Sequence, residues 1–248
     1  MERFRPKAHL HFSPHVRGWL LVVSECDDKK QYKEALTNTP SVDMVLFGRM
    51  VADDPSLNYD AAAQVAHSIS THAVQNEYDY FTAVDDCAAE DSAGAGHLGT
   101  AEYNSSTLYR YATVNALELL ENLGAEKVPE VIAAFGEAFA KSMPTGKQNS
   151  YANRTLPDAV YIAVREDQPV NLCGAFEKAV GKSYQGYVEA SKCALKNYAS
   201  YVYENFADAP VKSFVVGNGM EELGAQLPLK TVFAELKDTV AELLSETR

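Results

Sequence analysis

The 248-residue sequence lacks an apolar run long enough to cross a bilayer or to form the centre of a signal peptide. The longest aliphatic run near its start, Trp19–Val23, has five residues, whereas a membrane-spanning helix needs about 20. The four cysteines lie far apart and form no CxxC pair, so neither a zinc site nor a disulfide framework is expected. We therefore expect a cytoplasmic protein with no membrane partner.

Basic residues are also few, with 22 Lys and Arg against 34 Asp and Glu and a net charge of -12. This balance argues against a generic nucleic-acid binder, because neutralising phosphates requires clustered Lys and Arg. The charge is unevenly distributed, since residues 1–33 carry a net +3 and the remainder holds -15. A local groove can still bind a polyanion, so nucleic-acid binding would have to depend on specific residues.

The common nucleotide and hydrolase motifs are missing. A P-loop would need a glycine in place of Lys141 and a hydroxyl in place of Gln148, and neither is present. There is no Gly-x-Ser-x-Gly sequence and no signature of a Cys/His nucleophile. No enzyme motif remains, and we expect no cofactor.

Two groups of potential metal ligands have simpler interpretations. His9, His11 and His15 have ligand-like spacing but no nearby acid or cysteine, so zinc is not expected. A run of four acids lies on a small, glycine-containing segment, where a solvated loop is the usual outcome. These acids are Asp85, Asp86, Glu90 and Asp91.

A polar loop at residues 143–158 reads MPTGKQNSYANRTLPD and follows a predicted helix. Gly146 allows close backbone approach, and the next four side chains are hydrogen-bond donors suited to an oxyanion such as an RNA phosphate. They are Lys147, Gln148, Asn149 and Ser150.

The hydrophobic pattern predicts strands and helices without regular βαβ alternation, which favours the α+β class. Two aromatic-rich extended segments, His72–Val84 and His97–Val114, flank the acidic segment and predict a long β-hairpin or arm. Strands are expected at residues 42–48, 159–164 and 211–216. Helices are expected from residue 58 or 60 to about 69, and at residues 116–123, 129–142, 185–206 and 231–244. The last helix should bury Val232, Phe233, Leu236, Val240 and Leu243.

From Val42 onward the chain resembles the CasC family, the backbone subunit of the type I-E CRISPR surveillance complex Cascade. The resemblance covers Val42 to about Val180, and the C-terminal part fits more loosely. The matching blocks read VDMVLFGRMVADDPSLNYDAAAQVAHSISTHAV, YDYFTAVDD, GAGHLGTAEYNSSTLYRYATVN, SMPTGKQNSYANRTLPD and QPVNLCGAFEKAV.

The resemblance implies a modified RRM-like (ferredoxin-like) palm, helical fingers and a long β-hairpin thumb at about residues 72–114. Copies of such a subunit stack along the crRNA beside other Cascade subunits. The thumb displaces a guide nucleotide at intervals, and target DNA is recognised by pairing with the guide. The implied role is a non-catalytic scaffold in antiviral defence.

The resemblance also assigns RNA-binding residues. Arg49 matches a position that contacts the crRNA backbone, and Met50 one that packs against bases; Met50 could instead belong to the core. Lys147 and Gln148 match backbone-contacting positions. Four apolar thumb positions match a wedge beside the displaced nucleotide, although without the resemblance they could equally form hairpin core. They are Tyr80, Phe81, Val84 and Leu98.

The beginning of the chain departs from the family, since residues 1–33 do not contain its basic RRISSQ-type segment. We divide the chain into an atypical segment, 1–41, and a partial RRM-like domain, 42–248, and expect an N-terminally truncated member. Two alternatives to the scaffold function remain. One is a metal-dependent ribonuclease that uses Asp85 or Asp86, and the other is a truncated relic that does not assemble.

Overall fold

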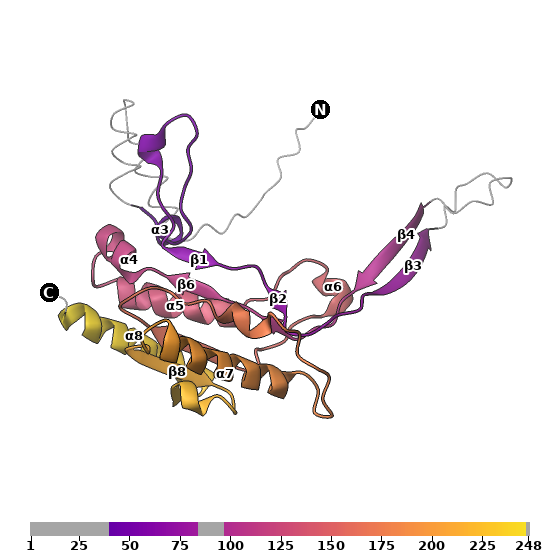
Figure 1. Ribbon diagram of the computed structural model, residues 1–248. Coiled ribbons are helices and arrows are strands. Elements are labelled where there is room, and N and C mark those ends of the chain that lie inside the picture. The colour runs from indigo at the N-terminus through magenta and orange to yellow at the C-terminus, as the bar shows by residue number, and fades with distance from the viewer. Residues whose placement is uncertain (1–39, 84–96, 247–248) are drawn as a thin grey trace, which may run out of the picture. The chain divides into compact units, whose positions relative to one another are not determined.

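The computed structural model describes residues 40–83 and 97–246, which form a mixture of helices and small sheets (Figure 1). The predicted α+β class is therefore confirmed. The chain divides into two compact units. Of the described residues, the first unit contains 40–65, 112–139 and 233–246, and the second contains 66–83, 97–111 and 140–232. No helix in these described ranges is both long and apolar enough to cross a membrane.

The first described element of the first unit is helix α3, Val42–Phe47, where we predicted a strand. The Ser41 side chain accepts a hydrogen bond from the Met44 backbone N–H (3.3 Å), and Gly48 ends the helix at a φ of 76°. A short apolar run is compatible with either a buried strand or a buried helix, and here the two caps favour the helix. The strand prediction was wrong.

Strand β1, Ala63–Val65, occupies part of the segment for which we predicted an alanine-rich helix. It pairs antiparallel with β6, Ala112–Val114, with Ala63 opposite Val114. Ala62 is buried and its N–H donates to the Val45 carbonyl (2.9 Å). Because the backbone bonds are made to a partner strand, tertiary pairing overrides the helix propensity of alanine, and the helix prediction was wrong.

Two predicted helices of this unit are confirmed. Helix α4, Ala116–Leu123, begins after Asn115, whose side chain accepts from the Leu117 and Glu118 N–H groups, and Gly124 ends it. Helix α5 spans Val128–Lys141 and lies in this unit except for its last two residues.

Helix α8, Leu229–Glu246, lies in this unit from Phe233 onward, and Phe233 packs closely against α5. A Cβ at Gly136 would lie 3.0 Å from Cε1 of Phe233, so glycine permits this close approach. The predicted apolar face is confirmed, since four of its residues are buried and Leu243 is half-buried. The four are Val232, Phe233, Leu236 and Val240.

The second unit contains a three-stranded sheet in the order β7-β8-β9. Strands β7, Val160–Val164, and β8, Lys212–Val216, are antiparallel, and β9, Ala225–Gln226, lies parallel to β8. Helix α7, Val188–Asn205, packs on the 3₁₀ segments Leu172–Phe176 and Glu221–Leu223. This sheet is the largest within the described ranges, and the modified RRM-like palm implied by the resemblance stays a prediction. The core of this unit contains Leu172, Ala199, Val202, Val215, Met220 and Leu223.

The predicted hairpin is present in the second unit. Strand β3, Glu77–Ala83, pairs antiparallel with β4, His97–Tyr103, and no other described strand joins this pair (Figure 1). Near its root, β2, Ile69–Ser70, pairs with β5, Leu108–Tyr109. The hairpin is therefore a two-stranded ribbon whose two faces have no covering sheet among the described residues.

Candidate nucleic-acid interface

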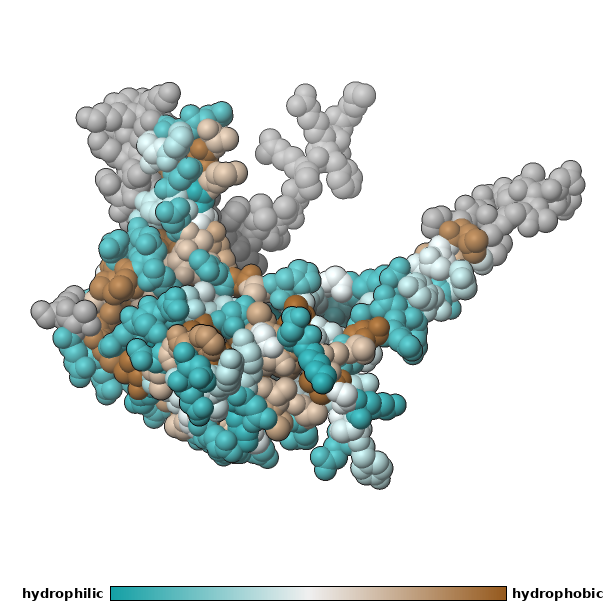
Figure 2. Space-filling view, in the orientation of Figure 1, coloured by the Kyte–Doolittle hydropathy of each residue, from teal (hydrophilic) through white to brown (hydrophobic). Residues whose placement is uncertain are grey.

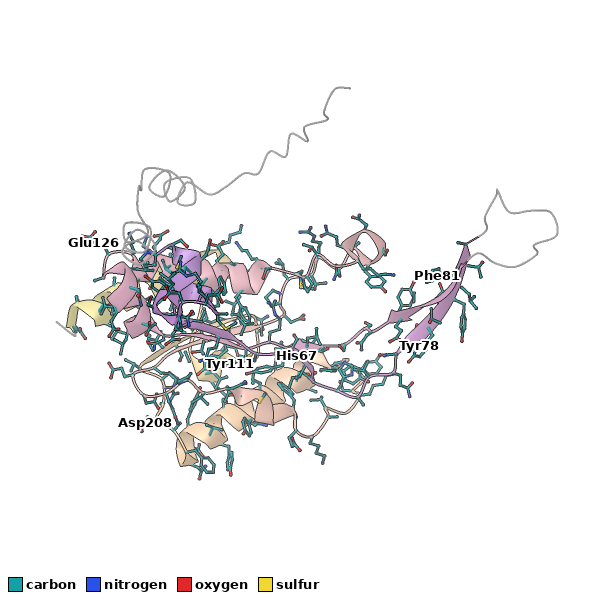
Figure 3. All side chains as sticks on the ribbon, turned by 90° about the horizontal axis from the view of Figure 1, so that it is seen from above. His67, Tyr78, Phe81, Tyr111, Glu126 and Asp208 are labelled. Atoms are coloured by element: carbon teal, nitrogen blue, oxygen red, sulfur yellow. The ribbon has the colours of Figure 1, made fainter. Side chains whose placement is uncertain are left out.

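Strand alternation places the predicted thumb residues on opposite faces of the β3–β4 hairpin. Tyr80 pairs with Thr100, and Thr82 pairs with Leu98, so Tyr80 and Leu98 are diagonal neighbours on one face. Phe81 pairs with Gly99 and belongs to the other face. Figure 3 labels Tyr78 and Phe81, which lie on opposite faces of β3 because they are three positions apart.

Tyr80 and Leu98 are open to a ligand. Their side chains are 74% and 67% exposed, and the described part of the chain offers the Tyr80 ring no hydrogen-bond or ring partner. Figure 2 shows apolar surface on the hairpin, in brown. The alternative that these two residues form hairpin core is wrong, because they are not covered by the described chain.

Phe81 is placed differently, because its ring lies across Gly99. A Cβ added to Gly99 would fall 2.5 Å from Cζ of Phe81, so the ring occupies the space that a side chain would need. Glycine on one strand thus receives an aromatic ring from the other, an arrangement that supports an exposed strand pair. Val84 lies outside the described residues, as do Asp85 and Asp86.

His72 joins the two chain segments at the hairpin root. It is buried, its Nδ1 donates to the Ala73 carbonyl (2.8 Å), and its Nε2 accepts from the Thr107 N–H (3.1 Å). These two bonds require the neutral tautomer protonated at Nδ1. The Thr71 N–H also donates to the Thr107 carbonyl (3.0 Å). Thr71 and His72 are therefore both hydrogen-bonded to Thr107, the residue before β5.

The 143–158 loop contains one short helix, α6, Gln148–Tyr151, preceded by Lys147 in the left-handed conformation (φ 52°). The Lys147 ammonium lies 5.4 Å from the centre of the Tyr151 ring. The Tyr151 hydroxyl donates to the Glu102 carbonyl (3.1 Å), and its ring lies 5.4 Å from that of Tyr103. The structure therefore brings the loop to the end of β4, beside the hairpin.

Sequence reasoning missed Tyr151 and Tyr103, which join the loop to the hairpin. Both are aromatic residues in segments already identified, but nothing in their spacing showed that they meet. It also missed Arg154, whose Nη2 donates to Oε1 of Gln148 (2.7 Å). One hydrogen-bonding group of Gln148 is therefore occupied, while Lys147 is exposed.

Arg49 and Met50 lie in the first unit, in a loop closed by backbone bonds between Arg49 and Tyr59 (3.0 and 2.9 Å). The Arg49 guanidinium donates through Nε and Nη2 to the Leu57 carbonyl (2.8 and 2.5 Å) and lies 5.2 Å from the centre of the Tyr59 ring. Arg49 thus supports its own loop. Met50 is 86% exposed, so the alternative that it belongs to the core is wrong.

The charges around the hairpin separate two kinds of contact. The described hairpin strands carry the acids Glu77, Asp79 and Glu102, whereas the adjoining loop carries Lys147 and Arg154. This arrangement suits apolar or stacking contacts on the hairpin and phosphate contacts at the loop. No group of three or more His, Cys, Asp or Glu side chains that could hold a metal ion occurs in the described ranges.

Residues 11–244 of the chain match the CT1975-like protein family. This match begins within the segment 1–41, whereas the resemblance to the CasC family begins at Val42. None of the curated proteins matches the chain.

Two solved structures are similar. One is a chain of a "CRISPR RNA-guided surveillance complex, pre-nicking", with 35% identity, a TM-score of 0.75 and coverage of 90% of this chain. The other is a chain of a "CRISPR RNA-guided surveillance complex", with 36% identity, a TM-score of 0.70 and coverage of 92% of this chain. This chain spans 62% of the first matched chain and 85% of the second. The protein therefore belongs to the CT1975-like (CasC-type) family.

Proposed function

We propose that this protein is a non-catalytic, crRNA-binding backbone subunit of a type I-E Cascade complex, in which copies assemble along the guide RNA and support recognition of target DNA. The palm of such a subunit would be RRM-like. Family membership and the similarity to surveillance-complex chains support the complex, while the site residues support the ligand.

The observation that carries the proposal is the uncovered apolar face of the hairpin, with Tyr80 and Leu98 largely exposed. A two-stranded hairpin is marginally stable alone in water, so one with large uncovered side chains gains stability from a partner. Stacking on such side chains accepts any base and contributes about 1–3 kcal/mol per base. A protein that must hold guides of every sequence needs this kind of contact.

The 143–158 loop supplies the complementary contact. Lys147 is exposed beside the hairpin, and its left-handed backbone is an uncommon conformation for a non-glycine residue. Backbone strain of this kind is frequent at ligand-binding positions. Lys147 would contact a phosphate, and Gln148 would add a polar contact through its remaining amide group.

The test is co-expression of the chain with a guide RNA and partner subunits, followed by purification and measurement of bound RNA. Lys147→Ala and Arg49→Ala should each weaken binding and lower the slope of log affinity against log salt by about 1. Lys230→Ala is the matched control, because Lys230 is exposed and its substitution removes the same charge.

Arg49→Ala also removes the bonds to Leu57, so circular dichroism and thermal unfolding must accompany it. Arg49→Lys, which keeps the charge and loses the paired bonds, separates the two effects. Purified complexes that carry no RNA, or Lys147 and Lys230 variants with equal affinity, would contradict the proposed function.

A further inference from the structure

The turn at residues 181–186 has a feature that the proposed contacts do not use: a fully exposed tyrosine on a well-defined backbone. Tyr184 has no covering side chain, and Lys182 and Gln185 beside it are also exposed. Lys182 is the only charged residue of the turn, in a chain with a net charge of -12. The turn itself therefore carries an exposed positive charge and no negative one.

Several hydrogen bonds define the turn. Ser183 and Gly186 form an isolated antiparallel bridge, and the Ser183 hydroxyl donates to the Gly186 carbonyl (2.5 Å). The Gln185 N–H donates to the same hydroxyl (3.2 Å). Gly186 has a φ of 85°, a conformation that favours glycine. Tyr184 is thus held at the tip of a closed turn, which reduces the entropy lost when a ligand stacks on it.

Both ends of the turn are attached to the hairpin root. On one side, the Val180 N–H donates to the Thr71 carbonyl (2.9 Å). On the other side, the Tyr187 ring stacks on His72, with ring centres 3.7 Å apart and planes 9° apart. The Ser191 hydroxyl also donates to Oγ1 of Thr71 (2.8 Å) in a buried bond. The turn and the hairpin root are therefore joined through Thr71 and His72 within the second unit.

We infer that the turn is a second stacking contact for single-stranded nucleic acid, with Tyr184 against a base and Lys182 against the adjacent phosphate. An exposed aromatic ring next to a single positive charge is the combination that binds single strands without sequence preference. Because the turn is joined to the hairpin root, one strand can contact both. This inference rests on the proposed function and adds a contact to the same site.

The experiment measures binding of a labelled single-stranded RNA, and of DNA with the same sequence, to the full chain by fluorescence anisotropy. Tyr184→Ala should weaken binding at least about fivefold, and Tyr184→Phe should retain it, because stacking needs the ring and not the hydroxyl. Lys182→Ala should lower the salt slope by about 1. Tyr201→Ala is the matched control, because Tyr201 is exposed on α7 and should leave both affinities unchanged.

The two nucleic acids distinguish the source of the base. If Tyr184→Ala loses more affinity for RNA than for DNA, the contact is assigned to the guide. If it loses more affinity for DNA, the contact is assigned to the target strand. Photo-crosslinking to a thio-substituted oligonucleotide should place the adduct on Tyr184. If Tyr184→Ala binds RNA and DNA as tightly as Tyr201→Ala does, the inference is overturned. It is also overturned if Tyr184→Ala loses self-association in the absence of nucleic acid while its RNA binding stays intact, because Tyr184 would then contact another protein copy.

Failure of the inference and failure of the proposed function give different results. If Lys147→Ala weakens RNA binding and Tyr184→Ala does not, the inference about Tyr184 fails and the proposed function stands. If neither substitution changes RNA binding, the proposed function fails as well.

Discussion

Gly146 is a glycine that the chain itself does not require. Its φ is not in the left-handed region, and a Cβ placed there would have no atom within 4 Å. The protein could therefore carry alanine at this position without strain or collision. A requirement for glycine would have to come from a ligand that approaches the backbone closely, which fits a phosphate at the 143–158 loop.

We predict that Gly146→Ala folds normally and binds guide RNA several-fold more weakly. Its thermal stability should stay the same or rise slightly. Alanine lowers the conformational entropy of the unfolded chain, which can raise the free energy of unfolding by about 0.4–1 kcal/mol. Thermal unfolding and RNA anisotropy measure the two effects.

Gly124→Ala is the reciprocal control, because Gly124 has a φ of 77° and open space around it. It should cost about 1–3 kcal/mol of stability and leave the RNA affinity unchanged. An RNA affinity for Gly146→Ala equal to that of the unmodified chain would show that the loop does not need this close approach.

Arg165 and Asp167 are coupled at the surface of the second unit. The Arg165 guanidinium donates to both carboxylate oxygens of Asp167 (2.8 and 2.6 Å) and to the Asp208 carbonyl (2.7 Å). Figure 3 labels Asp208. The hydrogen bonds from Arg165 hold the pKa of Asp167 below its ordinary value.

A carboxyl group with a lowered pKa stabilises the folded state above its unfolded pKa, and this contribution disappears as the pH falls through the folded pKa. We predict that Asp167→Asn lowers the melting temperature at neutral pH. The difference from the unmodified chain should shrink below about pH 4, the ordinary range for Asp. Melting curves across pH measure this.

Glu166→Gln is the control, because Glu166 is exposed and has no hydrogen bond within the described ranges. It should show no comparable pH-dependent difference. A constant difference for Asp167→Asn at all pH values would mean that the ion pair is not its cause.

At the scale of the elements, the predictions were best where a capping residue marks an end. Helix α4 has its predicted bounds, between the caps Asn115 and Gly124, and the later helices and strands of the chain also lie close to their predicted ranges. The two errors concern short segments. Residues 42–48 are an apolar run compatible with either a strand or a helix, and residues 58–69 depend on a distant partner. In the second, β6 supplies that partner, and its pairing with β1 is not readable from local composition.

The β3–β4 hairpin gives a prediction at this scale. Gly99→Val should push the Phe81 ring off the strand, because a Cβ at Gly99 would already lie 2.5 Å from the ring. Backbone amides of the hairpin should then exchange faster with solvent, and the ring-current shift on residue 99 should vanish. Hydrogen exchange and NMR chemical shifts measure both.

Ala101→Val is the control for this substitution. Ala101 lies two residues along the same strand and on the same face, so this substitution also places a valine on that face but does not replace the glycine across which the Phe81 ring lies. Equal hydrogen exchange in the two variants would mean that the Phe81 ring does not stabilise the hairpin.

At the scale of the whole molecule, the low content of basic residues and the proposed RNA partner are compatible. The chain has a net charge of -12, yet the residues proposed to contact phosphate occur in short loops and not in a broad basic surface. In the proposed repeated assembly, guide binding needs only a few such contacts per copy. The affinity of a single copy should accordingly be modest, and its salt slope should be shallow, at about -0.7 for each phosphate that the copy neutralises on a single strand.

The nuclease alternative is tested on the assembled complex. We predict that a complex with bound guide and complementary RNA shows no periodic, Mg²⁺-dependent cleavage, and that Asp85→Ala and Asp86→Ala change nothing. Denaturing gels with Mg²⁺ and with EDTA measure this. Cleavage that requires Mg²⁺ and disappears in either variant would establish an enzyme.

The relic alternative is tested by size-exclusion chromatography of the chain with guide RNA, partner subunits and a second member of the CT1975-like family. Entry of this chain into the large complex supports a working subunit. Its exclusion from that complex would favour the relic.

The family, the α+β class, the hairpin and the capped helices could all be inferred from the chain, because each depends on local pattern or on long blocks of matching residues. The identity of β1, the division of Tyr80 and Phe81 between two faces, and the meeting of Tyr151 with Tyr103 could not. These depend on strand register and on contacts between residues far apart in the chain, which are selected by the free energy of the folded whole. The same is true of Tyr184, whose attachment to the hairpin root through Tyr187 and His72 joins residues more than a hundred positions apart.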